Sequence, residues 1–143
     1  LIRRIKRGGR WASRIEIYNM DGADFLRKVV PTLPERSLLY LDPPYYVKGQ
    51  QMLYANYYGP DDHAGLAKIV RNSGRPWMVS YDDVKEVRRL YKNCRSIGYG
   101  IAYAAHHRYS GHERAFFSDT MTIPKVADPT KVTVTNLVHV ALT

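Results

Sequence analysis

The stretch that most constrains this fold is residues 38–46, in which Leu-Leu-Tyr-Leu is followed directly by Asp-Pro-Pro-Tyr-Tyr. Four consecutive apolar residues that end near a proline pair predict a strand buried on both faces. Pro43 and Pro44 lack an amide hydrogen and have a fixed φ, so the strand must end before them. Asp42 is therefore expected at the carboxyl end of the strand, where open α/β sheets bind their ligands.

The residues after this strand favour contact with an amino group on a planar ring. The carboxylate of Asp42 and the backbone carbonyl of Pro43 can each accept one N–H, and proline adds no competing donor. Two acceptors at one NH₂ group hold it still and favour a more tetrahedral nitrogen, whose lone pair then points at an electrophile. Tyr45 offers a flat face for a stacked base, worth about 1–3 kcal/mol. A base in a duplex reaches such a site only when it is flipped out.

Residues 40–46, Tyr-Leu-Asp-Pro-Pro-Tyr-Tyr, resemble the catalytic motif of amino-group methyltransferases that use S-adenosylmethionine (SAM). The resemblance is closest to the Dam-like branch of the DNA adenine-N6 methyltransferases. Residues 54–63 and 77–82 are similar to the segments downstream of the motif in that branch, and the resemblance covers roughly residues 14–119. Without these flanking matches, the motif would also fit a strand that ends in a Pro-Pro turn with a packed tyrosine.

The resemblance implies a site-specific enzyme that transfers a methyl group from SAM to N6 of a flipped-out adenine in double-stranded DNA. It implies SAM as the cofactor, no metal, and a cytoplasmic enzyme of the kind found in restriction-modification. Asp42, Pro43, Pro44 and Tyr45 are then the catalytic residues, and Asp42 also lies against the cofactor. The recognised DNA sequence and the oligomeric state are not predicted.

The segment before the motif predicts a strand and a helix. Residues 15–18 alternate between apolar and polar, as in a strand, and apolar residues then recur at helical spacing until Pro31. With the strand that precedes Asp42 they predict a βαβ unit whose strands are parallel. In the resembled family an acid after such a strand accepts a hydrogen bond from the adenine amine of SAM, and Asp21 matches that position. Capping of the helix by Asp21 or Asp24 is the alternative.

The resemblance implies an α/β fold with the Rossmann-like sheet of SAM-dependent methyltransferases, truncated on its N-terminal side, with an antiparallel hairpin at the C-terminal end. The family's Phe-x-Gly-x-Gly turn, which seats SAM, and its DNA-reading region are not in this sequence. Residues 1–13 are then a basic arm, residues 14–119 a partial catalytic domain, and residues 120–143 a tail without an assigned role. Alone, this segment is expected to bind SAM poorly and to turn over slowly or not at all.

Downstream of the motif, Pro60 followed by two acids predicts a helix start, and residues 76–81 predict a second buried strand. Asp83 and Glu86 have the spacing of a capping box for the next helix. Ser80 and Asp82 are expected beside the site, where they support it without contacting substrate. Residues 94–103 and 114–118 predict the hairpin, and Gly98 and Gly100 allow a bulge or a close approach.

The chain carries 22 lysines and arginines against 13 acids, a net charge of +9 that suits a polyanionic partner such as DNA. Tyr57 and Lys48, in an aromatic loop after the motif, are predicted to contact DNA, as are Arg108 and Arg114 in the hairpin. The alternatives are a surface loop whose tyrosines pack on the body and an exposed hairpin tip.

The first 14 residues contain six lysines and arginines and no acid. They fit either an arm that contacts phosphates or a solvated chain end. Trp11 is expected to pack in the core, although stacking on a base is the alternative.

The sequence excludes some other classes of protein and leaves three alternative functions open. Cys94 is the only cysteine, so the chain has no intrachain disulfide and no cysteine-based zinc site. No apolar run approaches the roughly 20 residues of a membrane span. His63 alone does not indicate a metal site. A methyltransferase acting on an RNA base, a non-catalytic DNA-binding module and an inactive remnant remain as alternatives.

Overall fold

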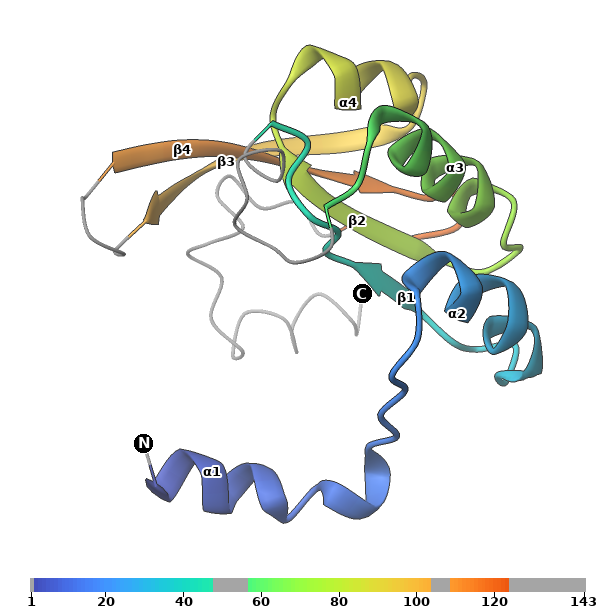
Figure 1. Ribbon diagram of the computed structural model, residues 1–143, viewed down its shortest axis with the longest axis vertical. Helices are drawn as coiled ribbons and strands as arrows, with labels where there is room; N and C mark the ends of the chain where they lie inside the picture. Colours follow the sequence, from blue (N-terminus) through green and yellow to red (C-terminus); the bar gives the residue numbers. More distant parts are fainter. Residues whose placement is uncertain (1, 48–56, 104–108, 124–143) are drawn as a thin grey trace.

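The structure is a computed structural model that describes residues 2–47, 57–103 and 109–123 (Figure 1). Its helices are α1 (Ile2–Gly9), α2 (Gly22–Lys28), α3 (Pro60–Arg71) and α4 (Lys85–Leu90), with short 3₁₀ turns at Ala12–Arg14 and Val30–Thr32. Its strands are β1 (Leu39–Leu41), β2 (Trp77–Asp82), β3 (Arg95–Tyr103) and β4 (Tyr109–Phe117). None of the helices in these ranges has the length and apolar character needed to cross a membrane.

The strands form one mixed sheet in the order β1-β2-β4-β3. β1 and β2 are parallel, so their carboxyl ends lie at the same edge, whereas β4 runs antiparallel to both β2 and β3. This confirms an α/β protein with an antiparallel hairpin at the far edge of the sheet from β1. β3 lies within the predicted range of residues 94–103, whereas β4 is longer than predicted, because it begins at Tyr109 instead of residue 114.

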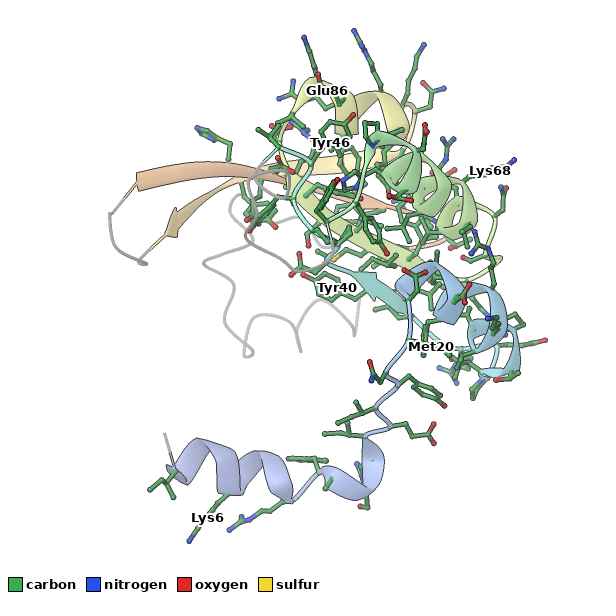
Figure 2. The ribbon with its side chains drawn as sticks, in the orientation of Figure 1. Lys6, Met20, Tyr40, Tyr46, Lys68 and Glu86 are labelled. Atoms are coloured by element: carbon green, nitrogen blue, oxygen red, sulfur yellow. The ribbon has the colours of Figure 1, made fainter. Side chains whose placement is uncertain are left out.

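The hydrophobic core lies between one face of the sheet and helices α2, α3 and α4 (Figure 1). Alternate residues of β1 and β2 point into it, and each helix adds apolar side chains. Its buried members include Leu39, Val79, Leu26, Leu66 and Val87. Each such side chain contributes about 1.5–3 kcal/mol by its burial. Lys68 on α3 points outward, away from the sheet (Figure 2).

The prediction that the strand before Asp42 is buried on both faces is wrong. Leu39 is 6% exposed, but its neighbours Leu38 and Tyr40 are 59% and 61% exposed. β1 therefore alternates, as does a strand with helices packed on one of its faces. The prediction failed because the helices of the described core pack only on the face of β1 that carries Leu39. On the other face, the Tyr40 hydroxyl lies 3.1 Å from the Ser80 hydroxyl.

The predicted strand at residues 15–18 is also wrong, and with it the parallel βαβ unit. The segment forms no strand, and Ile17 is 90% exposed. Within the described ranges only β2 lies beside β1, so this segment has no strand neighbour for its backbone N–H and C=O groups. Alternating apolar and polar residues do not form a strand when no neighbouring strand is available for backbone hydrogen bonds.

In the N-terminal segment, residues 2–9 form the helix α1. A helix is compatible with an arm that contacts phosphates, and that role stays a prediction. Trp11 is 54% exposed, and the guanidinium carbon of Arg14 lies 5.0 Å from the centre of its ring. The expectation that Trp11 packs in the core is therefore wrong. The ring instead makes a cation–π contact at the surface, which stabilises by about 0.5–1 kcal/mol.

The start of α3 agrees with the prediction from the local sequence, whereas the predicted cap of α4 does not form. α3 begins at Pro60 as predicted, and Asp62 accepts a hydrogen bond from the amide of Gly59 over 2.9 Å. The predicted capping box of α4 is wrong. Val84 precedes that helix without a side-chain cap, because the Asp83 carboxylate is engaged by two arginines instead.

Candidate active site

The Asp-Pro-Pro-Tyr segment leaves the sheet at the carboxyl end of β1. Asp42 is exposed there, and Pro43, Pro44 and Tyr45 are half-buried. The Asp42 carboxylate is thus not in a packed interior, and Tyr45 borders a hollow beside it. The motif is therefore open to a ligand, as predicted.

A chain of hydroxyl groups orients the Asp42 carboxylate. Ser80 on β2 donates to Asp42 Oδ1 over 2.8 Å, and the hydroxyl oxygen of Tyr40 lies 3.1 Å from Ser80 Oγ. An ionised carboxylate only accepts, so the one hydroxyl hydrogen of Ser80 is used on Asp42. Tyr40 must then donate to Ser80. Within the described residues Asp42 Oδ2 accepts no hydrogen bond, which leaves it for a ligand.

The turn after the motif is fixed by Asp82 at the end of β2. Asp82 is 8% exposed, and its two carboxylate oxygens accept from the backbone amides of Tyr46 over 2.9 Å and of Val47 over 3.1 Å. Hydrogen bonds to a charged acceptor are about twice as strong as neutral ones. The parallel pairing of β1 and β2 thus places Ser80 and Asp82 beside the site, as predicted.

The Tyr45 hydroxyl donates to Glu113 Oε1 on β4 over 2.8 Å. The other oxygen of that carboxylate, Oε2, accepts from the Tyr99 hydroxyl of β3 over 3.0 Å. Burial, together with the hydrogen bond to Glu113 and its charge, raises the pKa of Tyr99, so this tyrosine is a neutral donor at physiological pH. Both tyrosine rings are therefore fixed to one carboxylate.

Two hollows meet at the motif. A cleft of about 900 Å³ extends from Asp42 and the two prolines to α2, with Tyr18, Phe25 and Leu41 among its lining residues. A smaller hollow of about 150 Å³ is lined by the same aspartate and prolines together with Tyr45. The Asp-Pro-Pro segment therefore forms a wall shared by both hollows.

A family model of D12 class N6 adenine-specific DNA methyltransferases matches residues 11–108. The chain belongs to this family. The match includes the Asp-Pro-Pro-Tyr segment and confirms the resemblance to DNA adenine-N6 methyltransferases. A search of curated proteins found no match.

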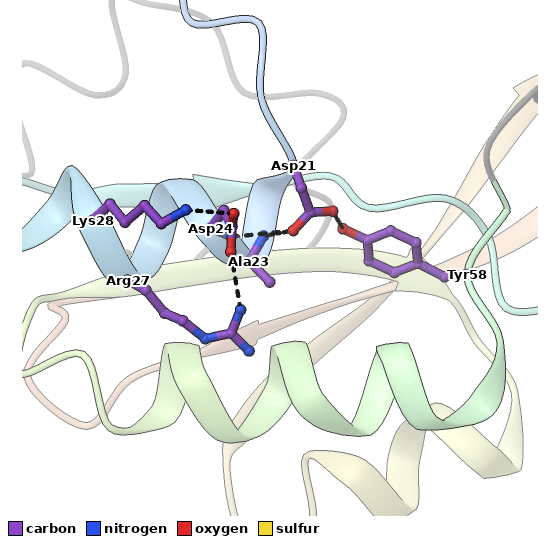
Figure 3. A network of polar contacts seen from close by, with 6 residues as sticks. All are labelled: Asp21, Ala23, Asp24, Arg27, Lys28 and Tyr58. Carbon is purple, nitrogen blue, oxygen red and sulfur yellow. Dashed lines mark hydrogen bonds and ion pairs between the residues drawn. The ribbon is translucent and has the colours of Figure 1, made fainter.

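In this D12 family member, Asp21 is the N-cap of α2. Its Oδ1 accepts from the amides of Ala23 over 2.9 Å and Asp24 over 3.1 Å (Figure 3). Its Oδ2 accepts a longer bond, of 3.4 Å, from the hydroxyl of Tyr58. Capping was the alternative to cofactor binding, and the structure shows the capping contact. The cofactor role of Asp21 stays a prediction, supported by Gly22 at the border of the larger cleft.

The loop after the motif is anchored at both ends on one buried histidine of α3. The ring of His63 lies 4.9 Å from that of Tyr46 and 5.5 Å from that of Tyr58, and its Nδ1 is 2.9 Å from the Tyr81 hydroxyl. Burial lowers the pKa of His63, although the charges of Asp82 and Asp62 oppose that shift. His63 is thus a residue with a structural role whose ring favours the neutral form.

The DNA-contact predictions have different outcomes. Tyr57 is 65% exposed and available for contact. Lys48 and Arg108 lie outside the described residues. Arg114 instead makes a bidentate ion pair with Asp83, with Nε–Oδ1 and Nη2–Oδ2 distances of 2.7 and 3.1 Å, so the structure gives it a structural role. Its contact with DNA stays a prediction.

Asp83 is held between two arginines, because Arg88 binds the same carboxylate through Nε and Nη2 over 2.7 and 2.8 Å. Burial alone would raise the pKa of Asp83, but the hydrogen bonds from Arg88 and Arg114 outweigh it and lower the pKa to about 2. Gly98 makes room for this pair, since a Cβ there would lie 3.1 Å from Arg114 Nη2. The close approach predicted at Gly98 is confirmed. The same prediction is wrong at Gly100, where a Cβ would lie within 4 Å of no described atom and the strand register continues without a bulge.

Two residues of the site were missed from the sequence: Glu113 and Tyr99. Glu113 falls just before residues 114–118, which the sequence predicts as a hairpin strand, but it lies within β4 and is 7% exposed. Only the strand register shows that it faces Tyr99. In the described part of the chain, no group of three or more histidines, cysteines, aspartates or glutamates is arranged to hold a metal ion.

Proposed function

We propose that this chain carries the active site of a methyltransferase that uses SAM and acts on N6 of an adenine flipped out of double-stranded DNA. The observation that carries the proposal is the shared wall: Asp42, Pro43 and Pro44 line both the large cleft and the small hollow beside Tyr45. A methyl donor on one side and an amino group on the other would meet at that wall. Membership of the D12 family supports the reaction class.

The larger cleft suits SAM. Its volume of about 900 Å³ lies within the range of about 300–1,000 Å³ of small-molecule sites. Tyr18 and Phe25 offer aromatic surface there, with ring centres 5.2 Å apart, and Asp42 offers a carboxylate near a positively charged ligand. When bound, SAM supplies a methyl group made electrophilic by a sulfonium sulfur. Asp21 and Asp42 are the residues that would hold it.

On the base side, Asp42 Oδ2 and the Pro43 carbonyl are the acceptors for the N6 amine. Tyr45 supplies the stacking face. With SAM bound, the nitrogen lone pair would face the methyl group and would form the new N–C bond, and the electron pair of the broken S–C bond would stay on sulfur. The amine then loses one proton, which the Asp42 carboxylate can accept. The contribution of the protein is therefore positioning and charge stabilisation.

The test is methyl transfer from tritiated SAM to duplex DNA, with the chain in excess over DNA so that a slow single turnover is recorded. After digestion to nucleosides, we expect the label in N6-methyldeoxyadenosine and about a hundredfold loss in Asp42→Asn. Asp61→Asn, an exposed carboxylate in the first turn of α3, is the matched control and should leave transfer unchanged. Label in cytosine, label in RNA alone, or no label with any acceptor would overturn the proposal.

A further inference from the structure

Glu113 on β4 is a buried carboxylate with both oxygens engaged by tyrosines. It is 7% exposed, and its Oε1 and Oε2 accept from the hydroxyls of Tyr45 over 2.8 Å and Tyr99 over 3.0 Å. A charged group in such a position is unfavourable unless hydrogen bonds replace its hydration. The two hydroxyl groups supply such bonds, and one of them belongs to the Asp-Pro-Pro-Tyr motif.

The strand register puts Glu113 in line with the other residue that holds the motif. In the sheet, Glu113 is opposite Asp82 of β2 on one side and opposite Tyr99 of β3 on the other. Residues directly opposite each other in an antiparallel pair place their side chains on the same face. Asp82 holds the backbone of Tyr46, and Glu113 holds the side chain of Tyr45. One row across three strands therefore fixes two consecutive residues of the motif.

We propose that Glu113 is a positioning residue that sets the plane of the Tyr45 ring, so that a base stacked on the ring presents its amino group to Asp42 and Pro43. The inference rests on the proposed function above. The ring borders the same small hollow as these two acceptors, so a tilt of the ring moves a stacked base relative to them. A misplacement of about 1 Å can lower the rate about a hundredfold.

The contact also limits what Tyr45 can read. Its one hydroxyl hydrogen is donated to Glu113, so the hydroxyl cannot also donate to a base, and the ring face is the surface we propose for stacking. Stacking tolerates every base, since each has a π-face. Discrimination between bases therefore depends on the two acceptors, Asp42 and the Pro43 carbonyl, which bind an exocyclic amine. The substrate class of this pocket is a base with an amino group, and a base without one would stack but not react.

The contact itself can be tested without substrate, by NMR of the full chain labelled with ¹³Cζ-tyrosine. The Tyr45 signal is assigned by its loss in Tyr45→Phe. We expect it to shift in Glu113→Gln, in which the amide cannot accept both hydroxyls, and to stay unchanged in Glu86→Gln, a glutamate on α4. Tyr99→Phe, which keeps Glu113, is a second variant should Glu113→Gln fail to fold, and it should also shift the Tyr45 signal. An unchanged Tyr45 signal in both site variants overturns the proposal.

The positioning role is tested by a double-mutant cycle on single-turnover methyl transfer. We expect Glu113→Gln and Tyr45→Phe each to lower the rate about tenfold, and the double variant to be no slower than either, because both remove the same contact. The SAM concentration for half-maximal rate should not change. Additive losses would mean that Glu113 acts only through the fold, and would overturn the role. No methyl transfer by the unaltered chain, with the NMR shift present, would overturn the proposed function and the role with it. Transfer without coupling overturns the role alone.

Discussion

Ser80 donates its hydroxyl hydrogen to Asp42 Oδ1 over 2.8 Å, although the two residues are 38 positions apart in the chain. The contact exists because β1 and β2 are parallel neighbours, which brings their carboxyl ends to one edge of the sheet. Because Oδ1 is occupied, Oδ2 is the oxygen left for a ligand. The serine therefore determines which part of the carboxylate meets the amine.

Replacement of this serine should affect methyl transfer more than stability. In Ser80→Ala, Asp42 loses the donor that orients it, and we expect single-turnover methyl transfer to fall about tenfold, the equivalent of about 1.4 kcal/mol. The control is Ser37→Ala, which removes a serine hydroxyl that donates to the Pro34 carbonyl over 2.7 Å. That variant should keep its rate. Equal losses in the two variants would contradict an orienting role for Ser80.

Loss of the Asp82 carboxylate should affect both stability and activity. In Asp82→Asn only one side-chain oxygen remains to accept, and the amide nitrogen faces a backbone N–H of the turn at Tyr46 and Val47. We expect urea unfolding to show a loss of about 1–3 kcal/mol, the usual cost of an unsatisfied buried group. Asp61→Asn, at an exposed position, should change the free energy of unfolding by about 0.5 kcal/mol at most. A stable Asp82→Asn variant would show that the turn is held elsewhere.

Local sequence patterns predicted the elements that depend on local rules. The proline pair ends β1, and Pro60 with its following acids begins α3. The predictions failed where the local structure depends on a residue that is distant in the sequence. The spacing of Asp83 and Glu86 fits a capping box, but Arg114 from β4 binds Asp83 across 31 positions. No local pattern contains that information.

The same reason explains which parts of the site could be predicted. Asp42 and Tyr45 lie in one contiguous motif, so the sequence alone sufficed to propose them, and their catalytic roles stay predictions. Glu113 acts on the motif only through the register of β4, and register depends on which strands pair. Residues 15–18 alternate like a strand, yet the described sheet offers them no neighbour.

Asp83 should make stability depend on acid pH. Its pKa is about 2 in the folded chain, below the value of 3.8 for a free aspartate. A lowered folded pKa means that the contribution is complete above about pH 3.8 and is lost as the pH falls through about 2. Because Arg88 is 55% exposed and its charge is screened, we expect a loss on the order of 1 kcal/mol. Urea unfolding between pH 5 and pH 2 should show this decline in the unaltered chain and a shallower one in Asp83→Asn. Identical slopes would contradict the assignment.

His63 should add a second, separate dependence at higher pH. Burial lowers its pKa, so the folded chain favours the neutral ring while the unfolded chain titrates near the ordinary value of 6.5. Its contribution is therefore complete above about pH 6.5, declines as the pH falls below it, and levels off below the folded pKa. In His63→Phe, which keeps a ring between Tyr46 and Tyr58, this part of the pH profile of unfolding should vanish. His112→Gln, at an exposed position on β4, should retain it. Because both ends of the loop after Asp-Pro-Pro-Tyr pack on His63, protonation should loosen the loop and destabilise the fold together. An unchanged profile in His63→Phe would mean that another group titrates in this range.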